Sequence, residues 1–185
     1  MVKVEKFSEH DLDIEILSDG NASKTESFRC YEKELEDFLA EDALNNQNAK
    51  ISVTYLIFQK AGKNLVGYMT VLNDSINLNA DLKEFFKGKD IMYKSLPAMK
   101  IGRMAVHDDY QDKGVGSFMI LFAINLASRI GESSGCRFII VDSKRNHSDP
   151  AKDPIHFYKK KGFKVLRERE KGTTAMYLDL YLKEK

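Results

Sequence analysis

This sequence of 185 residues is poor in net charge, in cysteine and in long apolar runs. Its 29 Lys and Arg residues against 28 Asp and Glu residues leave a formal net charge of +1, which provides no general attraction to nucleic acid or to an anionic membrane. The apolar stretch at residues 118–126 is broken by Asn125, and residues 1–16 are too charged for a signal peptide. We therefore expect a cytoplasmic protein with no membrane-spanning segment.

Only two cysteines are present, Cys30 and Cys136. They could form one disulfide in principle, but without an export signal we expect reduced thiols. The length suits one domain with a substantial core, and a composition of 43% hydrophobic and 31% charged residues is ordinary for a globular protein. Because no repeat, low-complexity segment or convincing linker is apparent, we expect one domain over residues 1–185.

The spacing of apolar residues predicts both strands and helices. Strands are expected at residues 2–7, 51–59, 65–72, 99–106, 137–142, 163–166 and 174–182. Helices are expected at residues 32–44, 81–86, 117–130 and 153–161. Residues 8–27 show no clear period and are expected to form a loop. The predicted class is α/β, with one central mixed, mostly antiparallel sheet and helices on both of its faces.

A glycine-containing loop is expected between the strand at residues 99–106 and the helix that follows it. Gln111, Gly114 and Gly116 form the pattern Q-x-x-G-x-G. The first N–H groups of a helix have no partner within it, so a strand, loop and helix start in this order can bind phosphate. A Walker loop is excluded because Lys113 precedes the first glycine, and a dinucleotide fingerprint is excluded because position 119 is Met.

This loop resembles the pyrophosphate-binding segment of the GNAT superfamily, the acetyl-CoA-dependent N-acetyltransferases. A second motif downstream is similar to the closing signature of that family, an aromatic pair followed by a helix-ending Gly-Phe: Phe157-Tyr158-x-x-x-Gly162-Phe163. Two motifs in this order are far more specific than either alone. The resemblance covers about residues 50–181 and implies a single GNAT-like domain.

The resemblance implies acetyl-CoA as the acyl-donor cosubstrate. The backbone of Met104, Ala105 and Val106 would then pair with the pantetheine arm as an added strand does. Amides around the loop would hold the pyrophosphate, at Asp112, Lys113, Gly114, Val115, Gly116 and Ser117. Gln111 would brace the loop, and Lys113 would add positive charge. Ordinary core packing by Met104 and Val106 is compatible with these roles.

Tyr158 stands where the family often has a general acid for the coenzyme A thiolate. A phenol with a pKa near ~10 suits that leaving group, and such proton transfer typically contributes ~10²–10⁴-fold to the rate. The alternative is a tyrosine that only fills the edge of the sheet.

The general base departs from the pattern of histone-type members, which carry a glutamate four residues before the position of Met104. That position is Lys100 here, and the substitutes are Asp142 and His107, acting through water. The alternative for each is a solvated residue at a strand end. An amine bound near neutrality needs no dedicated base.

Residues 144–153 look enlarged relative to the family. Position 152 is Lys, where many relatives have asparagine, and Asn146 is left open as its replacement. Four residues could be drawn as a metal site, namely His147, Asp149, Asp153 and His156. Because their spacing is not that of a dense ligand set, we predict no metal site. The basic run at residues 159–161 is expected to be a solvated face, although an anionic acceptor or the ribose phosphate of the coenzyme could reach it.

The leading function hypothesis is transfer of an acetyl group from acetyl-CoA to an amine acceptor of unknown identity. A second hypothesis is toxin-like acetylation of aminoacyl-tRNA, because Phe28-x-Cys30 followed by Leu35 and Phe38-Leu39 loosely resembles a GNAT branch that includes toxins of toxin–antitoxin pairs. The near-neutral charge disfavours that reading. A third hypothesis is a non-catalytic acyl-CoA sensor. A homodimer is left open, and no membrane partner is expected.

Overall fold

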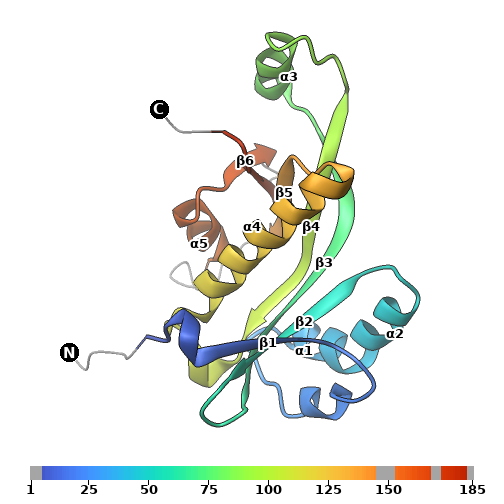
Figure 1. The fold of residues 1–185 in the computed structure, drawn as a ribbon. Coiled ribbons are helices and arrows are strands. Elements are labelled where there is room, and N and C mark those ends of the chain that lie inside the picture. Colours follow the sequence, from blue (N-terminus) through green and yellow to red (C-terminus); the bar gives the residue numbers. More distant parts are fainter. Residues whose placement is uncertain (1–5, 145–152, 168–171, 183–185) are drawn as a thin grey trace, which may run out of the picture. The chain divides into compact units, whose positions relative to one another are not determined.

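The computed structural model describes residues 6–144, 153–167 and 172–182 (Figure 1). The chain divides into two compact units. Unit 1 comprises residues 1–72 and 102–122, and unit 2 comprises residues 73–101 and 123–185. Two strands and one helix run through both units, so each unit contains consecutive pieces of the same elements.

The described strands form one sheet in the order β1-β2-β3-β4-β5-β7-β6. Their bounds are β1 Leu12–Ile16, β2 Val53–Gln59, β3 Leu65–Asn77, β4 Ser95–Val106, β5 Phe138–Lys144, β6 Lys164–Arg167 and β7 Thr173–Asp179. The helices are α1 Lys33–Asp37, α2 Ala43–Asn48, α3 Ala80–Lys87, α4 Val115–Ser134 and α5 Pro154–Lys160. The β4–β5 pair is parallel, whereas β1–β2, β2–β3, β5–β7 and β6–β7 are antiparallel. The predicted α/β class with a mixed, mostly antiparallel sheet is confirmed.

Tyr68 of β3 organises one face of the sheet in unit 1. It is fully buried, its hydroxyl donates a 2.7 Å hydrogen bond to the Leu35 carbonyl, and its ring meets Phe28 edge-on at 5.4 Å. Leu56, its partner on β2, points to the same face and joins the same core cluster. The helical residues of that cluster include Leu39 and Ala43. The helical segment at residues 33–48 therefore covers this face.

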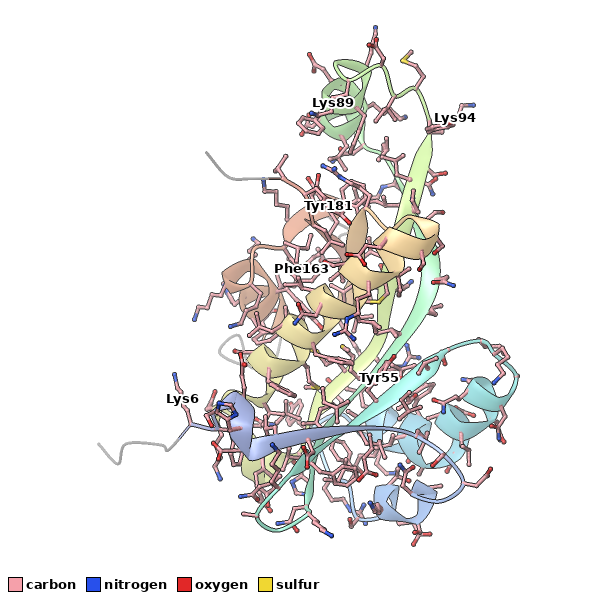
Figure 2. All side chains as sticks on the ribbon, in the orientation of Figure 1. Lys6, Tyr55, Lys89, Lys94, Phe163 and Tyr181 are labelled. Carbon is pink, nitrogen blue, oxygen red and sulfur yellow. The ribbon has the colours of Figure 1, made fainter. Side chains whose placement is uncertain are left out.

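The start of α4 covers the opposite face of unit 1. Side chains alternate along a strand, so Gly67 points away from the face of Tyr68. A Cβ placed on Gly67 would lie 3.1 Å from Val115 Cγ1 and 3.4 Å from Met119 Cε. On the neighbouring strand, Tyr55 meets Phe122 of α4 edge-on at 4.8 Å (Figure 2). Helices thus lie on both faces of this part of the sheet, as predicted.

Helices also lie on both faces of unit 2. Phe138 and Ile140 of β5 pack with Leu82 and Phe86 of α3, which places α3 on their face. The paired residues Ile139 and Leu178 point to the other face. A Cβ on Gly162, which follows α5, would lie 3.4 Å from Leu178 Cδ1, so α5 lies on that second face.

The helical segment of unit 1 is interrupted by a π-helical turn. Residues Phe38–Asp42 form this turn between α1 and α2, and the Ala43 amide donates to the Phe38 carbonyl five residues earlier. The predicted helix at residues 32–44 is confirmed and extends to Asn48. Leu39 and Ala43, four residues apart in this segment, are both buried.

The N-terminal prediction is wrong. Lys6 and Phe7 are not in a strand, and residues 1–5 lie outside the described part. The first strand is β1, inside the segment predicted to be a loop. Leu12, Ile14 and Ile16 do alternate, but Ile16 is 54% exposed and acidic residues stand between them, so the pattern resembled a polar loop. β1 is an edge strand, and an edge strand needs little apolar surface.

Several boundaries also differ from the predictions. β3 continues to Asn77, because Ile76 is buried although the three residues before it are exposed and polar. β4 begins before Pro97, at Ser95. Helix α4 starts at Val115 and ends at Ser134, four residues beyond the predicted end at Ile130.

By length and composition alone, α4 is apolar enough to cross a membrane, which corrects the expectation that no stretch approaches a spanning length. The core helix of a soluble protein passes the same test. Val115, Met119, Ile120, Ala123 and Ala127 are buried within the protein and form one stripe, as in a helix that packs one face against a core. The absence of a membrane partner stays a prediction.

The close approach of α4 to β3 gives a stability prediction. A Cβ at Gly67 would lie 3.0 Å from the Ala105 carbonyl oxygen, which is tighter than ordinary packing. Gly67→Ala is therefore expected to lower the free energy of unfolding by about 1–3 kcal/mol, the usual cost of overpacking. The measurement is urea denaturation. Gly20→Ala is the control, because the nearest atom to its Cβ is 3.8 Å away. Equal stability of the two variants would contradict the prediction.

Candidate active site

The predicted coenzyme loop lies in unit 1, between the end of β4 and the start of α4. Asp112 and Gly114 have positive φ angles of 60° and 91°, so the chain turns sharply at both positions. The first intrahelical bond runs from the Phe118 amide to the Gly114 carbonyl at 3.0 Å. The amides of the first α4 turn, Val115, Gly116 and Ser117, precede that bond and have no acceptor one turn back in the helix. Loop and helix start thus present donor groups together.

Side chains from three segments hold this loop. The Gln111 side-chain amide donates to Asp108 Oδ1 at 2.8 Å, as expected for a residue that braces the loop. The Lys113 carbonyl accepts from the Phe7 amide at 2.9 Å, and the Lys113 ammonium lies 5.0 Å from the centre of the Tyr110 ring. Asn64 donates to the Tyr110 hydroxyl at 3.0 Å. None of Tyr110, Phe7 and Asn64 belongs to a motif, so their contacts with the loop could not be predicted from the sequence.

Met104, Ala105 and Val106 occupy the last positions of β4, as predicted. Ala105 is 7% exposed and belongs to the core cluster of unit 1, whereas its two neighbours are half-buried. The next residue, His107, donates its amide to the Val66 carbonyl at 2.9 Å, which continues the course of β4 beside β3. The Ala105 side chain packs in the core, which does not prevent the backbone of this strand end from pairing with the pantetheine arm. That backbone role stays a prediction.

Tyr158 lies in unit 2, on α5. It is 5% exposed, with its ring 5.4 Å from Phe157 and 5.2 Å from Phe163. Burial raises the pKa of Tyr158 above its ordinary value, since the phenolate would be poorly solvated. The hydroxyl therefore keeps its proton at neutral pH, which a general acid requires. The same shift makes it a weaker acid, and its role as the proton donor to the thiolate stays a prediction.

Lys100 forms ion pairs with two carboxylates of unit 2. Its Nζ lies 2.6 Å from Asp142 Oδ2 on β5 and 3.8 Å from Asp74 Oδ2 on β3. Lys100 pairs in register with Ile140, so this group lies on the face covered by α3, opposite the face of α5. The position of the family's glutamate thus holds an ammonium. The nearest substitute base, Asp142, is already bound to that ammonium.

His107 is held as a structural residue of unit 1. Its Nδ1 accepts a 3.2 Å hydrogen bond from the Asp109 amide, and its ring meets Phe28 and Tyr110 edge-on at 5.7 and 5.6 Å. These contacts hold the His107 ring between Phe28 and Tyr110, and its role as a substitute base stays a prediction.

The remaining sequence candidates divide between described and undescribed residues. Asp153 caps α5, since its Oδ1 accepts from the Ile155 amide at 2.9 Å. His147, Asp149, Asn146 and Lys152 lie outside the described residues. Within residues 6–144, 153–167 and 172–182, no group of three His, Cys, Asp or Glu side chains is placed to hold a metal ion.

Neither cysteine has the properties of an acyl-accepting nucleophile. Both are buried and free, Cys30 in unit 1 and Cys136 in unit 2. Burial raises the pKa of Cys30 to about 11, and burial also raises the pKa of Cys136. The reactive thiolate is therefore scarce at neutral pH, which favours direct transfer over an acyl-cysteine intermediate.

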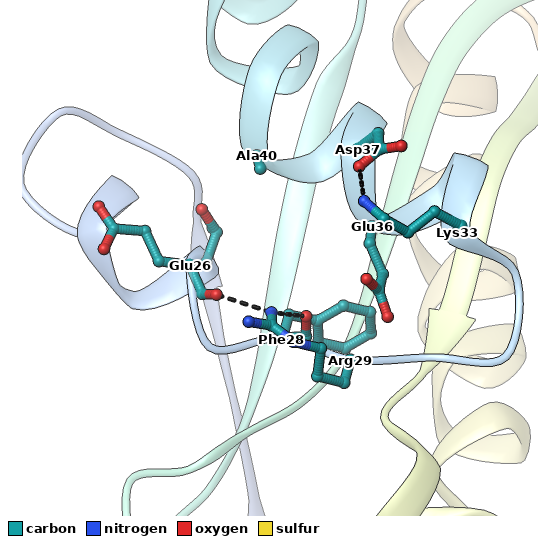
Figure 3. A pocket seen from close by; sticks show the side chains of 8 residues that line it. Glu26, Phe28, Arg29, Lys33, Glu36, Asp37 and Ala40 are labelled. Atoms are coloured by element: carbon teal, nitrogen blue, oxygen red, sulfur yellow. Dashed lines mark hydrogen bonds and ion pairs between the residues drawn. The ribbon is translucent and has the colours of Figure 1, made fainter.

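A small pocket in unit 1 was not indicated by any motif (Figure 3). It has a volume of about 210 Å³ and is lined by Thr25, Glu26, Phe28, Arg29, Lys33, Glu36, Asp37 and Ala40. Most of its charged groups already have partners. Arg29 donates to the carbonyls of Glu26 and Phe28 at 2.7 and 2.6 Å, Lys33 pairs with Asp37, and Glu36 accepts from the Cys30 amide at 2.7 Å. We assign no ligand to this pocket.

The comparisons with known proteins agree with the loop and the fold. Residues 53–165 match the family model described as an acetyltransferase (GNAT) domain, which is more than half of the chain. The chain belongs to the GNAT acetyltransferase family. The protein is therefore an acyltransferase that uses acetyl-CoA as its acyl donor, and the sensor hypothesis loses its support.

Solved structures with the same fold include two of AtaT. One shows AtaT complexed with acetyl-methionyl-tRNAfMet, with a TM-score of 0.73 and 25% identity over 91% of this chain and 95% of that chain. Another shows AtaTR bound with AcCoA, with a TM-score of 0.71 and 26% identity over 92% and 95% of the two chains. A mutant of KacT is similar in fold, with a TM-score of 0.75 and 20% identity over 92% and 95%.

Gly116 gives a test of the loop in this GNAT enzyme. It is the second residue of α4 and has a helical backbone, so a side chain is tolerated there. Gly116→Val is expected to weaken acetyl-CoA binding about 10- to 100-fold, because a branched side chain would hold the pyrophosphate away from one or two amides. Calorimetric titration measures the change, with circular dichroism to show folding and Gly20→Val as the control. Unchanged affinity in a folded variant would show that the loop is only a helix entry.

Tyr158→Phe tests the general acid. The change removes one hydroxyl and keeps the ring contacts with Phe157 and Phe163. Turnover is expected to fall by about 10²–10⁴-fold with little change in acetyl-CoA affinity, since the bond strengthens mainly in the transition state. Single-turnover kinetics separates chemistry from product release. Phe157→Tyr is the control, because it alters the neighbouring ring without touching this hydroxyl. Wild-type single-turnover rates for Tyr158→Phe would refute the role.

Proposed function

We propose that this enzyme transfers the acetyl group of acetyl-CoA to the α-amino group of an aminoacyl-tRNA. The observation that carries the proposal is the likeness, over nine-tenths of the chain, to AtaT complexed with acetyl-methionyl-tRNAfMet. A cytoplasmic location, where charged tRNA is found, belongs to the same proposal.

The pairing of Asp142, the carboxylate nearest to the position of the family's glutamate among the described residues, with Lys100 supports an α-amino acceptor. An α-amino group has a pKa of about 7.7–8.0, so roughly a quarter of it is neutral at pH 7.4. A lysine side chain, with a pKa of about 10.4, is neutral in only roughly one molecule in a thousand. Lysine acetylation thus needs a base more than α-amine acetylation does. The Lys100 ammonium bound to Asp142 fits the acceptor that needs no strong base.

The reaction balances with the groups at hand. The neutral amine attacks the thioester carbonyl carbon, a C–N bond forms and the C–S bond breaks. The amine loses one proton to water, and the departing thiolate gains one from the Tyr158 hydroxyl, which regains its own from solvent. The loop and α4 amides hold the pyrophosphate, so the thioester is positioned before the acceptor arrives.

Acetyl transfer to charged tRNA is the direct test. Labelled acetyl-CoA is incubated with the enzyme and aminoacylated tRNA, and the label should enter the RNA fraction and leave it as N-acetyl amino acid after mild alkaline hydrolysis of the ester. Uncharged tRNA is the matched control and should stay unlabelled. A lysine-containing peptide serves as the competing acceptor. Rapid labelling of the peptide with none of charged tRNA would overturn the proposal and return the acceptor to another amine.

A further inference from the structure

A helical excursion between two central strands, residues 78–94, projects exposed side chains from unit 2. We call it the α3 arm. Asn79 caps α3 by accepting from the Leu82 amide at 3.0 Å, and Leu82 and Phe86 are buried against Ile76 and Phe138. The return to β4 is held as well, because the Leu78 amide donates to the Lys94 carbonyl at 3.1 Å. The arm is therefore a fixed support and not a loose loop.

The outward side of the α3 arm carries apolar and aromatic groups in water. Met92 is 73% exposed and Tyr93 is 72% exposed, while Phe85 is 37% exposed. Tyr93 is not part of the buried cluster beneath it, whereas the Phe85 ring meets Phe86 of that cluster edge-on at 5.1 Å. The backbone at residues 89–91 is tied back to the Phe86 carbonyl, which accepts from the amides of Lys89 and Ile91 at 2.9 and 3.0 Å. Exposure of these groups is thus imposed by the fold.

Positive charge gathers on the same arm. The whole arm has a net charge of +1, from Lys83, Lys87, Lys89 and Lys94 against Asp81, Glu84 and Asp90. Its second half, residues 87–94, carries three lysines against Asp90 and has a net charge of +2. In the described part of the chain, none of these lysines has a carboxylate within 4.0 Å, in contrast to Lys100. The Lys89 ammonium lies 5.2 Å from the centre of the Phe85 ring instead. Figure 2 shows Lys89 beside α3 and Lys94 where the arm returns to β4.

We propose that the α3 arm is an RNA-docking surface, with Lys87, Lys89 and Lys94 on phosphates and the Tyr93 ring stacked on a base. The inference rests on the proposed aminoacyl-tRNA acceptor and names the surface that receives the body of that RNA. Lysines without carboxylate partners, interleaved with exposed aromatic rings, match what unpaired or looped RNA offers. Such a surface is compatible with the near-neutral charge of the whole chain, because RNA binding depends on the local charge and not on the total charge.

The first experiment measures RNA binding alone. Uncharged tRNA is titrated with the full-length protein at several salt concentrations. In Lys87→Gln/Lys89→Gln/Lys94→Gln, the slope of log affinity against log salt should be less steep by about 2, at roughly 0.7 per lost phosphate contact. The charge-matched control is Lys50→Gln/Lys60→Gln/Lys63→Gln, which removes three exposed lysines of unit 1 and should keep the wild-type slope.

The second experiment isolates the aromatic contact. Tyr93→Ala is expected to weaken tRNA binding about 5- to 100-fold, the range found for base stacking, while Tyr93→Phe keeps the ring and the affinity. Because Tyr93 is 72% exposed, neither change should alter the melting temperature. Equal affinity of the two variants would overturn the stacking contact.

The third experiment separates this inference from the proposed function. The variants of the α3 arm should lower kcat/KM for charged tRNA and leave kcat/KM unchanged for an amino acid ester, which carries the same amine without RNA. If wild-type enzyme acetylates charged tRNA and the lysine variant matches its control, the docking surface is refuted and the function stands. If no tRNA is acetylated but the arm variants lose RNA binding, the function fails and the surface stands. Competition by polyglutamate with RNA binding unchanged in the variants would assign the arm to an acidic protein and refute the proposal.

Discussion

The arrangement of unit 1 depends on how closely α4 approaches β3 at Gly67. With no side chain at that position, the Ala105 carbonyl and the Val115 side chain both come within 3.1 Å of where a Cβ would stand. This contact sets the height of the α4 start above the sheet. The amides of the first α4 turn, and the loop before them, are positioned by it. A larger residue would lift the helix, and the anion-binding groups would move with it.

The loop itself is stabilised by contacts that are individually weak. One backbone bond from Phe7, one side-chain bond from Gln111 and a cation–π contact from Lys113 to Tyr110 surround it. Such exposed contacts restrict the loop without making it rigid. If the loop binds pyrophosphate as the sequence predicts, its order is expected to increase on binding, because the ligand would neutralise the charge of Lys113 and give acceptors to the amides of the first α4 turn.

The polar groups of unit 2 differ between the two faces of the sheet. Burial raises the pKa of Tyr158, so its hydroxyl keeps its proton. On the other face, Lys100 is paired with the carboxylates of Asp142 and Asp74. The position at which histone-type members carry a glutamate is thus part of an ion-paired group, and the catalytic roles expected of Tyr158 and of a base stay predictions.

Sequence alone determined the family and the α/β class and located the loop that we predict to bind the coenzyme, because these depend on local patterns. Q-x-x-G-x-G before an apolar helix, and an aromatic pair before Gly162, are readable without neighbours. The tertiary structure decided what depends on contacts between distant residues. It placed β1 at the edge of the sheet and extended β3 to Asn77. It also placed Phe7 and Asn64 beside the loop and paired Asp142 with Lys100. Lys100 and Asp142 are 42 residues apart, and only the parallel register of β4 and β5 places them together. The exposure of the Met92 and Tyr93 side chains could not be predicted either, because the sequence does not show whether a Tyr or Met is buried or faces water.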